Sequence, residues 1–278
     1  MSERFTNAEA ASLSGERLSF SFGDNWVRYL QRLDEHQIRQ AEESLAEALG
    51  GEPPIGKTFL DVGCGSGLFS LCAARLGAAT IVSMDIDPAS IACAKRLRGA
   101  HADSAPWSIL QGSVLDQDFV AGLEPADIVY SWGVLHHTGA MWDAIDRCLR
   151  LVAPGGQACI ALYNRPNHLR SQLVLKRTYN RLPRFLRPGL VGAYAFGLLG
   201  AVLFKARRNP IEYVRAYGRR SRGMSFWRDV EDWLGGLPFE WTEPPRLIAF
   251  VRARGFEVDR VVTRPPGGNN EYLLRQVT

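Results

Sequence analysis

The sequence predicts an α/β fold, in which a doubly wound and mostly parallel sheet carries helices on both faces. Three observations predict it. Short apolar runs alternate with helix-forming stretches between residues 58 and 163, a glycine-rich turn follows the first run, and polar residues end several others. With 278 residues, of which 46% are hydrophobic and 22% charged, the chain can bury a sizeable core and has an ordinary globular composition.

The expected elements follow one another along the chain with short connections. Apolar residues recur at helical spacing over 25–49, and the glycines and prolines at 50–54 end an N-terminal helical cap, residues 1–54. Strands are expected at 58–62, 80–84, 107–111, 127–131 and 157–163, with helices at 68–76, 88–98 and 141–151. A helix at 245–254 precedes strands at 258–263 and 271–276, whose Pro-Pro-Gly-Gly connection predicts an antiparallel hairpin.

Residues 164–242 interrupt this pattern with a basic, largely helical insertion. They hold 15 basic and 5 acidic side chains, so the net charge of +4 for the whole chain hides a local excess of +10. The insertion leaves and rejoins the core (55–163 and 243–278) beside strand ends, so we expect a substrate lid with apolar and aromatic walls. A solvated basic face is the alternative, and arginines around the apolar stretch 190–204 are compatible with peripheral membrane contact.

Cysteine usage and the N-terminus predict a cytoplasmic protein. The five cysteines are scattered, without a CxxC pair or a Cys/His cluster at zinc-site spacing, so reduced thiols and no metal are expected. The polar start MSERFTNAEAAS lacks the apolar stretch of a signal peptide. The apolar stretch 190–204 has 15 residues, fewer than the ~20 of a spanning helix, so no transmembrane helix is expected.

A glycine-rich turn, Gly63-Cys64-Gly65-Ser66-Gly67, links the first expected strand to the first helix of the core. Glycines there let a ligand approach the backbone closely at a helix N-terminus. The GxGxG spacing differs from the GxGxxG of pyrophosphate binders, and Asp61 before the turn would repel a pyrophosphate but suits an ammonium group. Both features disfavour a nicotinamide-binding fold.

Three further strand ends place polar residues at the same expected edge of the sheet. Asp85, about 20 residues after the turn, can accept both hydroxyls of a ribose, and Ile86 offers an apolar face to an adenine. Ser113 and Ser131 lie at the ends of the next two strands. Trp132 could form a wall of a cofactor pocket or contact the substrate.

Taken in order, the motifs DVGCGSG, MDID, GSVLD and DIVYSWGVLHH, followed by LVAPGG, resemble those of class I S-adenosylmethionine-dependent methyltransferases. The resemblance covers residues 55–163 and 243–278. The segments FSFGDNW, DWLGGLPFE and GGNNEYLLR are similar to those of a subgroup of bacterial small-molecule methyltransferases. The resemblance implies a seven-stranded Rossmann-like sheet with an antiparallel last strand, and S-adenosyl-L-methionine as the cofactor.

The resemblance also implies a role for each matching residue. Asp61, Gly63 and Gly65, with Cys64 between the glycines, would hold the methionine end of the cofactor. Asp85 would take the ribose hydroxyls, and Ile86, Ser113 and Val114 would surround the adenine. Many relatives place an aspartate where Ser113 stands, and serine is the weaker acceptor for the adenine amine. The remaining candidate cofactor contacts are Ser131, Trp132 and, from a cap helix that would lid the cofactor, Trp26.

Candidate acceptor-side residues follow the fourth and fifth strands and lie in the hairpin. The candidate general bases are His136, His137 and Glu271, and a base is needed only if the nucleophile must lose a proton. The histidines could instead pack beside the cofactor. Candidate substrate contacts are Tyr163, Asn164, Asn269 and Asn270, for which a core position or a solvated turn is the alternative.

These observations favour methyl transfer to an O, N or C atom of a small, bulky apolar or aromatic metabolite. One alternative is an RNA methyltransferase whose basic insertion contacts phosphates. The chain lacks a separate RNA-binding module and an NPPY motif after the fourth strand, so a nucleic-acid partner is disfavoured. The other alternative is a non-catalytic cofactor-binding protein. The oligomeric state is left open.

Overall fold

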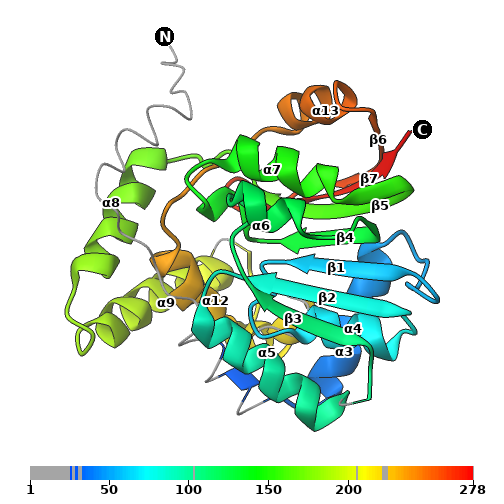
Figure 1. The fold of residues 1–278 in the computed structure, drawn as a ribbon. Helices are drawn as coiled ribbons and strands as arrows, with labels where there is room; N and C mark the ends of the chain where they lie inside the picture. The colour runs from blue at the N-terminus through cyan, green and yellow to red at the C-terminus, as the bar shows by residue number, and fades with distance from the viewer. Residues whose placement is uncertain are drawn as a thin grey trace.

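A seven-stranded mixed sheet forms the centre of the molecule (Figure 1). The computed structural model describes residues 26, 29–30, 33–102, 104–204, 206–220 and 225–277. The strand order is β3-β2-β1-β4-β5-β7-β6. Strands β1 to β5 are parallel, β7 is antiparallel to β5, and β6 is antiparallel to β7. The predicted doubly wound sheet with an antiparallel last strand is therefore confirmed.

The strands have the expected order, and most of their bounds agree with the sequence. The strands are β1 (Thr58–Val62), β2 (Thr80–Asp85), β3 (Trp107–Gln111), β4 (Ala126–Trp132), β5 (Val152–Tyr163), β6 (Phe256–Val262) and β7 (Asn269–Gln276). Strand β5 begins five residues before the expected start, because the chain pairs with β4 through Val152 before the register shifts. The apolar pattern does not predict this part of the strand, because the glycines at 155 and 156 interrupt the run of apolar residues.

Two helical layers cover the sheet (Figure 1). One layer contains α3 (Glu35–Ala48), α4 (Leu68–Arg75) and α5 (Pro88–His101), and the other contains α6 (Gln117–Ala121), α7 (Met141–Arg150) and α13 (Pro244–Arg252). Each layer buries its own apolar cluster against the sheet. The short helix α6 is not expected from periodicity, and it forms because the Asp116 side chain accepts from the N–H groups of Asp118 and Phe119.

The basic insertion folds as helices beside one end of the sheet (Figure 1). They are α8 (Leu169–Arg181), α9 (Arg187–Phe204), α10 (Pro210–Arg215), α11 (Tyr217–Arg220) and α12 (Phe226–Gly235). Their own apolar cluster centres on Tyr179, Ala195 and Phe226. A second cluster joins Leu173 and Phe239 to Tyr163 at the carboxyl end of β5, so the insertion is packed onto the ligand-bearing edge of the sheet.

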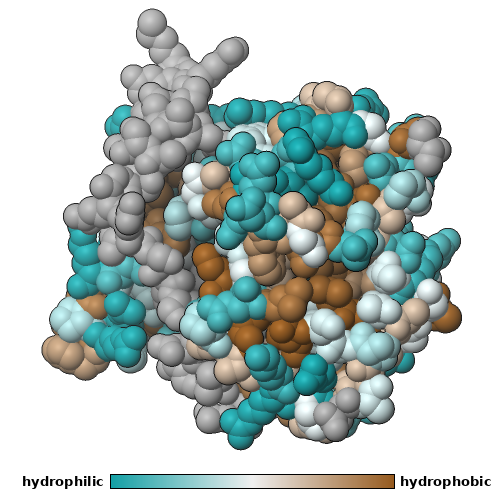
Figure 2. Space-filling model, viewed as in Figure 1, coloured by the Kyte–Doolittle hydropathy of each residue, from teal (hydrophilic) through white to brown (hydrophobic). Residues whose placement is uncertain are grey.

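Helix α9 is longer than the apolar stretch in the sequence. It starts at Arg187 and has 18 residues, with Pro188 accommodated in its first turn. By length and composition it could cross a membrane, and only 6% of it is buried. Ala195 and Val202 are its buried positions. Figure 2 shows pale brown atoms bordered by teal ones at the lower left, where Figure 1 places the turn between α8 and α9.

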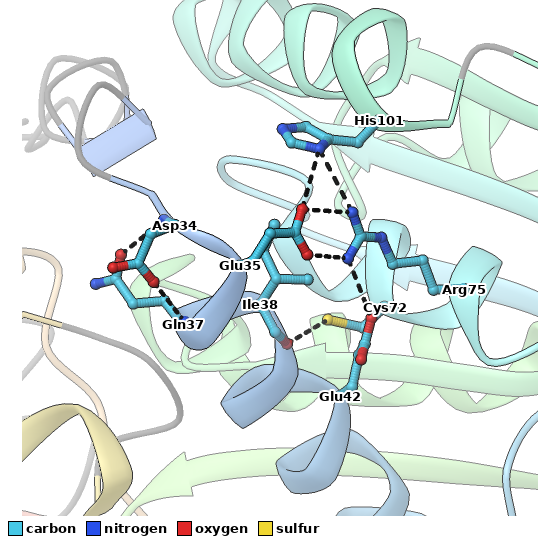
Figure 3. Close-up of polar contacts among 8 residues, drawn as sticks. All are labelled: Asp34, Glu35, Gln37, Ile38, Glu42, Cys72, Arg75 and His101. Carbon is cyan, nitrogen blue, oxygen red and sulfur yellow. Dashed lines mark hydrogen bonds and ion pairs between the residues drawn. The ribbon is translucent and has the colours of Figure 1, made fainter.

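Polar contacts fix helix α3 against α4 (Figure 3). Asp34 and Gln37 form a reciprocal capping box at the start of α3. Arg75 on α4 donates two hydrogen bonds to the Glu35 carboxylate, at 2.8 and 3.0 Å. The Cys72 thiol contacts the Ile38 carbonyl oxygen at 3.9 Å. The part of the predicted N-terminal cap that precedes Trp26 lies outside the described residues.

Candidate functional site

The glycine turn after β1 packs between two side chains from distant parts of the chain. Gly63 and Gly65 have φ angles of +78° and +54°, the left-handed region that favours glycine. A Cβ at Gly63 would lie 2.4 Å from Val134 Cγ1, and one at Gly65 would lie 2.8 Å from the indole of Trp26. Only glycine therefore fits at both positions, and the structure brings Trp26 to the turn that the sequence assigns to the cofactor.

Asp85 ends β2 beside the same turn. Its Oδ2 accepts from the Gly65 N–H and its Oδ1 from the Asp87 N–H, both at 2.9 Å. Burial raises the pKa of Asp85, and these two backbone donors oppose that rise. Each carboxylate oxygen has two acceptor sites, so both oxygens retain capacity for a ligand hydroxyl. The next side chain, Ile86, is 68% exposed and presents an apolar surface at this edge.

Asp61 supports the turn from inside the protein. The Ser70 hydroxyl donates to Asp61 Oδ2 at 2.6 Å and lies 2.6 Å from the Ser83 hydroxyl, which accepts from Trp107 Nε1. Burial raises the pKa of the Cys64 thiol, and the Asp61 carboxylate is the second cause. Asp61 therefore lies close to the turn, but Oδ2 is engaged within the core. Its contact with the methionine end of the cofactor stays a prediction.

The loop after β3 carries the two residues expected near the adenine. The Ser113 hydroxyl accepts from the Leu115 N–H at 3.1 Å. The Gly112 N–H donates to the Asp85 carbonyl oxygen at 3.0 Å, which ties this loop to the end of β2. Val114 is buried in the core under the loop. Ser113 and Val114 thus lie next to Asp85, and their adenine contacts remain predicted.

Ser131 and Trp132 close β4 in different ways. Ser131 is fully buried, and its hydroxyl donates to the Val62 carbonyl oxygen at 2.9 Å, joining the end of β4 to the end of β1. Trp132 is partly buried and packs against the apolar cluster on the α3 and α4 side of the sheet. Trp132 is therefore placed as a wall at the sheet edge, whereas Ser131 supports the strands beneath it.

Both histidines after β4 are neutral near pH 7. Burial lowers the pKa of His137 to about 3, with Lys176 as the second cause, and burial lowers the pKa of His136 well below its usual range. His136 Nδ1 accepts from the Tyr163 N–H at 3.3 Å, so its proton lies on Nε2. His137 Nδ1 lies 2.6 Å from the Pro238 carbonyl oxygen, which places the proton on Nδ1 and leaves Nε2 as the proton-accepting nitrogen.

Tyr163 is the meeting point of β5, the histidines and the insertion. Its ring centroid lies 4.1 Å from that of His136, 5.4 Å from that of His137 and 5.0 Å from that of Phe239. Burial raises the pKa of the Tyr163 phenol. The side chain therefore belongs to a packed cluster at the ligand-bearing edge.

Asn164, the residue after β5, has an evident structural task. Its N–H donates to the Gly268 carbonyl oxygen and its side-chain amide donates to the Arg264 carbonyl oxygen, both at 2.8 Å. It thereby fastens the end of β5 to the β6–β7 hairpin. A substrate contact by Asn164 would come in addition to this task and stays a prediction.

The hairpin separates the three residues that the sequence places at the site. Register pairs Tyr163 with Asn269, so Asn269 and Glu271 share the face of Tyr163. Asn270 points to the opposite face, is fully buried and accepts from the Arg264 N–H at 2.8 Å. Glu271 accepts from the Arg264 guanidinium at 2.9 Å. Asn270 therefore holds the hairpin, and Asn269 and Glu271 remain the candidates on this face.

Comparison with known proteins identifies the core. A family described as "Methyltransferase domain" matches residues 60–160, the segment from β1 to β5. The ubiquinone biosynthesis O-methyltransferase of Methylobacterium sp. (strain 4-46) is 34% identical over 119 residues, which cover 43% of this chain and 46% of that protein. Residues 60–160 form a class I S-adenosylmethionine-dependent methyltransferase domain. The domain thus coincides with the parallel part of the sheet and its glycine turn.

Other similar proteins agree with this methyltransferase domain. The ubiquinone biosynthesis O-methyltransferase of Pseudomonas savastanoi pv. phaseolicola is 31% identical over 150 residues, covering 50% of this chain and 62% of that protein. The chain therefore spans about half the length of these curated relatives. The structure of magnesium protoporphyrin IX methyltransferase from Synechocystis PCC 6803 with bound SAH has a TM-score of 0.55 and 14% identity, over 91% of this chain and 93% of that one. At that identity it shows the shared fold.

The residues at this edge fit S-adenosyl-L-methionine, the cofactor of such domains. Without Cβ atoms, the glycine turn exposes its backbone at this edge and packs closely against Val134 and Trp26. Asp85 keeps acceptor capacity for hydroxyls, and exposed Ile86 offers an apolar face to a base. In the parts of the chain that the structure describes, no group of three or more His, Cys, Asp or Glu residues could hold a metal ion.

The sequence analysis does not identify two buried ionisable residues of the insertion. Lys176 on α8 is 0% exposed, and burial lowers its pKa to about 7. Glu240 is 6% exposed, accepts from the Met141 N–H at 3.0 Å at the start of α7, and has a pKa raised to about 7 by burial. The chain has only 4 lysines beside 29 arginines, but composition does not indicate where a lysine lies. No sequence pattern shows that either group is buried.

Proposed function

We propose that this protein catalyses S-adenosylmethionine-dependent methyl transfer to an O, N or C atom of a small, bulky apolar or aromatic metabolite. The carrying observation is that the insertion packs its aromatic cluster onto the carboxyl edge that holds the glycine turn and Asp85. The names of the similar O-methyltransferases support a small-molecule acceptor. The proposal includes a role in small-molecule biosynthesis in the cytoplasm.

The protein's part in this reaction is to bind, orient and exclude water. When bound, S-adenosyl-L-methionine supplies a methyl group that is already activated on a sulfonium sulfur. The turn at Gly63 and Gly65, with Asp85, positions the cofactor. The insertion closes the acceptor side with Tyr163 and Phe239, which contact each other. Positioning and water exclusion are the main catalytic contributions expected for such a reaction.

The experiment that tests this function follows labelled methyl groups. Incubation with methyl-labelled S-adenosyl-L-methionine and a bacterial metabolite extract should transfer label to a small molecule and form S-adenosylhomocysteine. Label in RNA or protein instead would favour a macromolecular acceptor. Cofactor binding without transfer to any fraction would support a non-catalytic binding protein and contradict the proposal.

His137 is proposed as the general base, with His136 and Glu271 as the other candidates. His137 Nε2 is the proton-accepting nitrogen, whereas His136 carries its proton on Nε2 and Glu271 is paired with Arg264. His137→Asn can keep a donor to the Pro238 carbonyl while it removes Nε2. For an acceptor that must lose a proton, we expect kcat to fall by ~100-fold or more.

The control for this variant is His36→Asn on the exposed surface of α3, which should keep full turnover. Affinity for S-adenosylhomocysteine should be unchanged in both variants. If His137→Asn retains the parental kcat at saturating acceptor, then the base is another group or the reaction needs none.

The insertion is also proposed to contact an anionic membrane surface. Phe185, Phe196 and Phe204 are 79%, 81% and 79% exposed, and arginines at 184, 207 and 208 flank them in sequence. Because α9 packs through Ala195 and Val202 within the insertion, contact in the plane of the membrane is favoured over insertion across it.

Vesicle binding tests this contact. The protein should co-sediment with phosphatidylglycerol vesicles more than with phosphatidylcholine vesicles, and salt should weaken the binding. Phe185→Ser with Phe196→Ser should reduce binding by ~10-fold or more. Ile55→Ser is the matched control, because Ile55 is equally apolar and 69% exposed but lies in the core domain. Equal binding of wild type to both kinds of vesicle, or none, would contradict the proposal.

A further inference from the structure

A single cation lies in an aromatic enclosure between the insertion and the methyltransferase core. Lys176 is 0% exposed, and its Nζ lies 4.5 Å from the ring centroid of Trp233, 4.8 Å from that of Phe239 and 5.9 Å from that of Tyr163. These rings come from α12, the segment after α12, and the end of β5. The ammonium is thus held by aromatic faces, which attract cations but do not neutralise them.

Lys176 stands outside the ion pairs of the described residues. No carboxylate there pairs with it, and burial is the only cause that shifts its pKa. The charged and titratable groups around it are His136 and His137, whose pKa values Lys176 helps to lower, and the Tyr163 phenol, whose pKa is raised by burial and then by Asp232 and Asp229 of α12. Charged side chains are almost never fully buried unless they are paired. Near pH 7 the enclosure therefore holds a partly protonated lysine, whose charged form a bound anion would stabilise.

Capping of α12 accounts for only one of the three donors of this ammonium. Nζ donates to the Trp233 carbonyl oxygen in the last turn of α12, where a lysine is a favourable cap. A second free carbonyl oxygen at the end of α12, that of Gly235, accepts a hydrogen bond from the Asn180 side-chain amide at 2.8 Å. Within the part of the chain that the structure describes, the other two N–H groups of Lys176 have no oxygen acceptor.

The position of the enclosure connects it to methyl transfer. Tyr163 lies against Lys176 on one side and against both histidines on the other. The histidines follow Val134, which contacts the glycine turn at Gly63. Tyr163, the two histidines and Val134 therefore connect the ammonium to the glycine turn through a continuous series of contacts.

We propose that Lys176 binds an ionised oxygen on an aromatic acceptor, a phenolate or a carboxylate, with the rings of Tyr163, Trp233 and Phe239 around it. The inference rests on the function proposed above and narrows the acceptor to an aromatic acid. Burial is the main cause of the low pKa of His137 and the Lys176 charge is the second, so an anion beside Lys176 offsets the second cause and makes that imidazole a better proton acceptor. Lysine suits this task because, unlike arginine, it can lose its proton when the site is empty.

Calorimetric binding to the full chain, saturated with S-adenosylhomocysteine, tests the proposal. The probes are 2-naphthoate, 2-naphthol and the neutral 2-naphthalenemethanol. Wild type should bind 2-naphthoate at least ~10-fold more tightly than the neutral alcohol, and Lys176→Met should remove that preference while alcohol binding changes little. Above pH 7, binding of 2-naphthoate should take up protons, because the pKa of Lys176 rises from about 7 when the anion binds. A purely structural lysine would give no such uptake.

Two variants control the experiment. Lys95→Met removes an exposed lysine on α5 and should keep both the preference and the proton uptake. Lys176→Arg keeps the charge and should retain part of the preference. Lys176→Met replaces a buried ionisable group by an apolar side chain of similar length, so this variant should fold and show a cooperative thermal unfolding transition.

The outcomes separate this inference from the function on which it rests. Failure of wild type to bind S-adenosylhomocysteine would overturn both. Three outcomes, each with normal S-adenosylhomocysteine binding, would overturn the inference alone. Wild type could bind 2-naphthoate no more tightly than the neutral alcohol, or Lys176→Met could keep the wild-type preference for 2-naphthoate. The third outcome is that wild type binds none of the three probes. Even if a variant does not fold, the affinities of wild type for 2-naphthoate and for the neutral alcohol test the inference. Affinity for 2-naphthol relative to 2-naphthoate then tells whether the site takes phenolates or carboxylates.

Discussion

Replacement of Asp85 by alanine should weaken S-adenosylhomocysteine binding by ~10- to 100-fold, the effect of removing hydrogen bonds to a charged group worth ~1.5–3 kcal/mol. Two causes act together. The ligand loses a carboxylate acceptor at the edge of the sheet, and the backbone N–H groups of Gly65 and Asp87 lose the oxygens that hold the turn. Titration calorimetry on the full chain measures the change.

The isosteric variant Asp85→Asn separates the two causes. It keeps a carbonyl oxygen for one backbone donor but removes the charge and part of the acceptor capacity. We expect an intermediate loss of affinity. Asp259→Ala on β6 is the matched control, since Asp259 is exposed and pairs with Arg275 at the far side of the sheet. Unchanged affinity in Asp85→Ala would contradict the assignment of Asp85 to the cofactor.

Replacement of residues 169–235 by a short Gly/Ser linker should lower methyl transfer by ~100-fold or more while S-adenosylhomocysteine affinity stays within ~3-fold. The reason is geometric. The glycine turn and Asp85 belong to the core, whereas Lys176, Trp233 and the cover over Tyr163 belong to the insertion. Loss of the cover admits water and leaves the acceptor unoriented, and small errors of position cost about two orders of magnitude.

The design keeps residues 236–242 because they support the core. Glu240 accepts from the Met141 N–H at the start of α7, and the Thr242 N–H donates to the Tyr163 carbonyl oxygen at 3.0 Å. As a control, Gly/Ser replacement of residues 182–186, the turn between α8 and α9, should leave transfer to a water-soluble acceptor intact. A protein without residues 169–235 that still methylates at the parental rate would refute the lid.

Much of the core was predictable because its signals are local. Apolar runs of five to seven residues, helix caps and a glycine turn are set by neighbours in the chain, so β1, β2 and β3 were placed to within a residue. The sequence predicts β5 too short, since Gly155 and Gly156 break the apolar pattern while pairing to β4 continues. Helix α6 was missed because five residues and one cap give too short a period.

The candidate site also has a part that local sequence signals predict and a part that only long-range contacts determine. By itself the sequence determined which residues stand at the ends of the parallel strands, so Asp61, Asp85, Ser113 and His137 could be named in advance. The tertiary structure decided which candidate site residues are engaged inside the protein, as Asp61 is with Ser70 and Asn270 is with Arg264. It also decided that Lys176 is buried among aromatic rings from three separate segments. Burial depends on contacts between residues far apart in the chain, and no local pattern contains them.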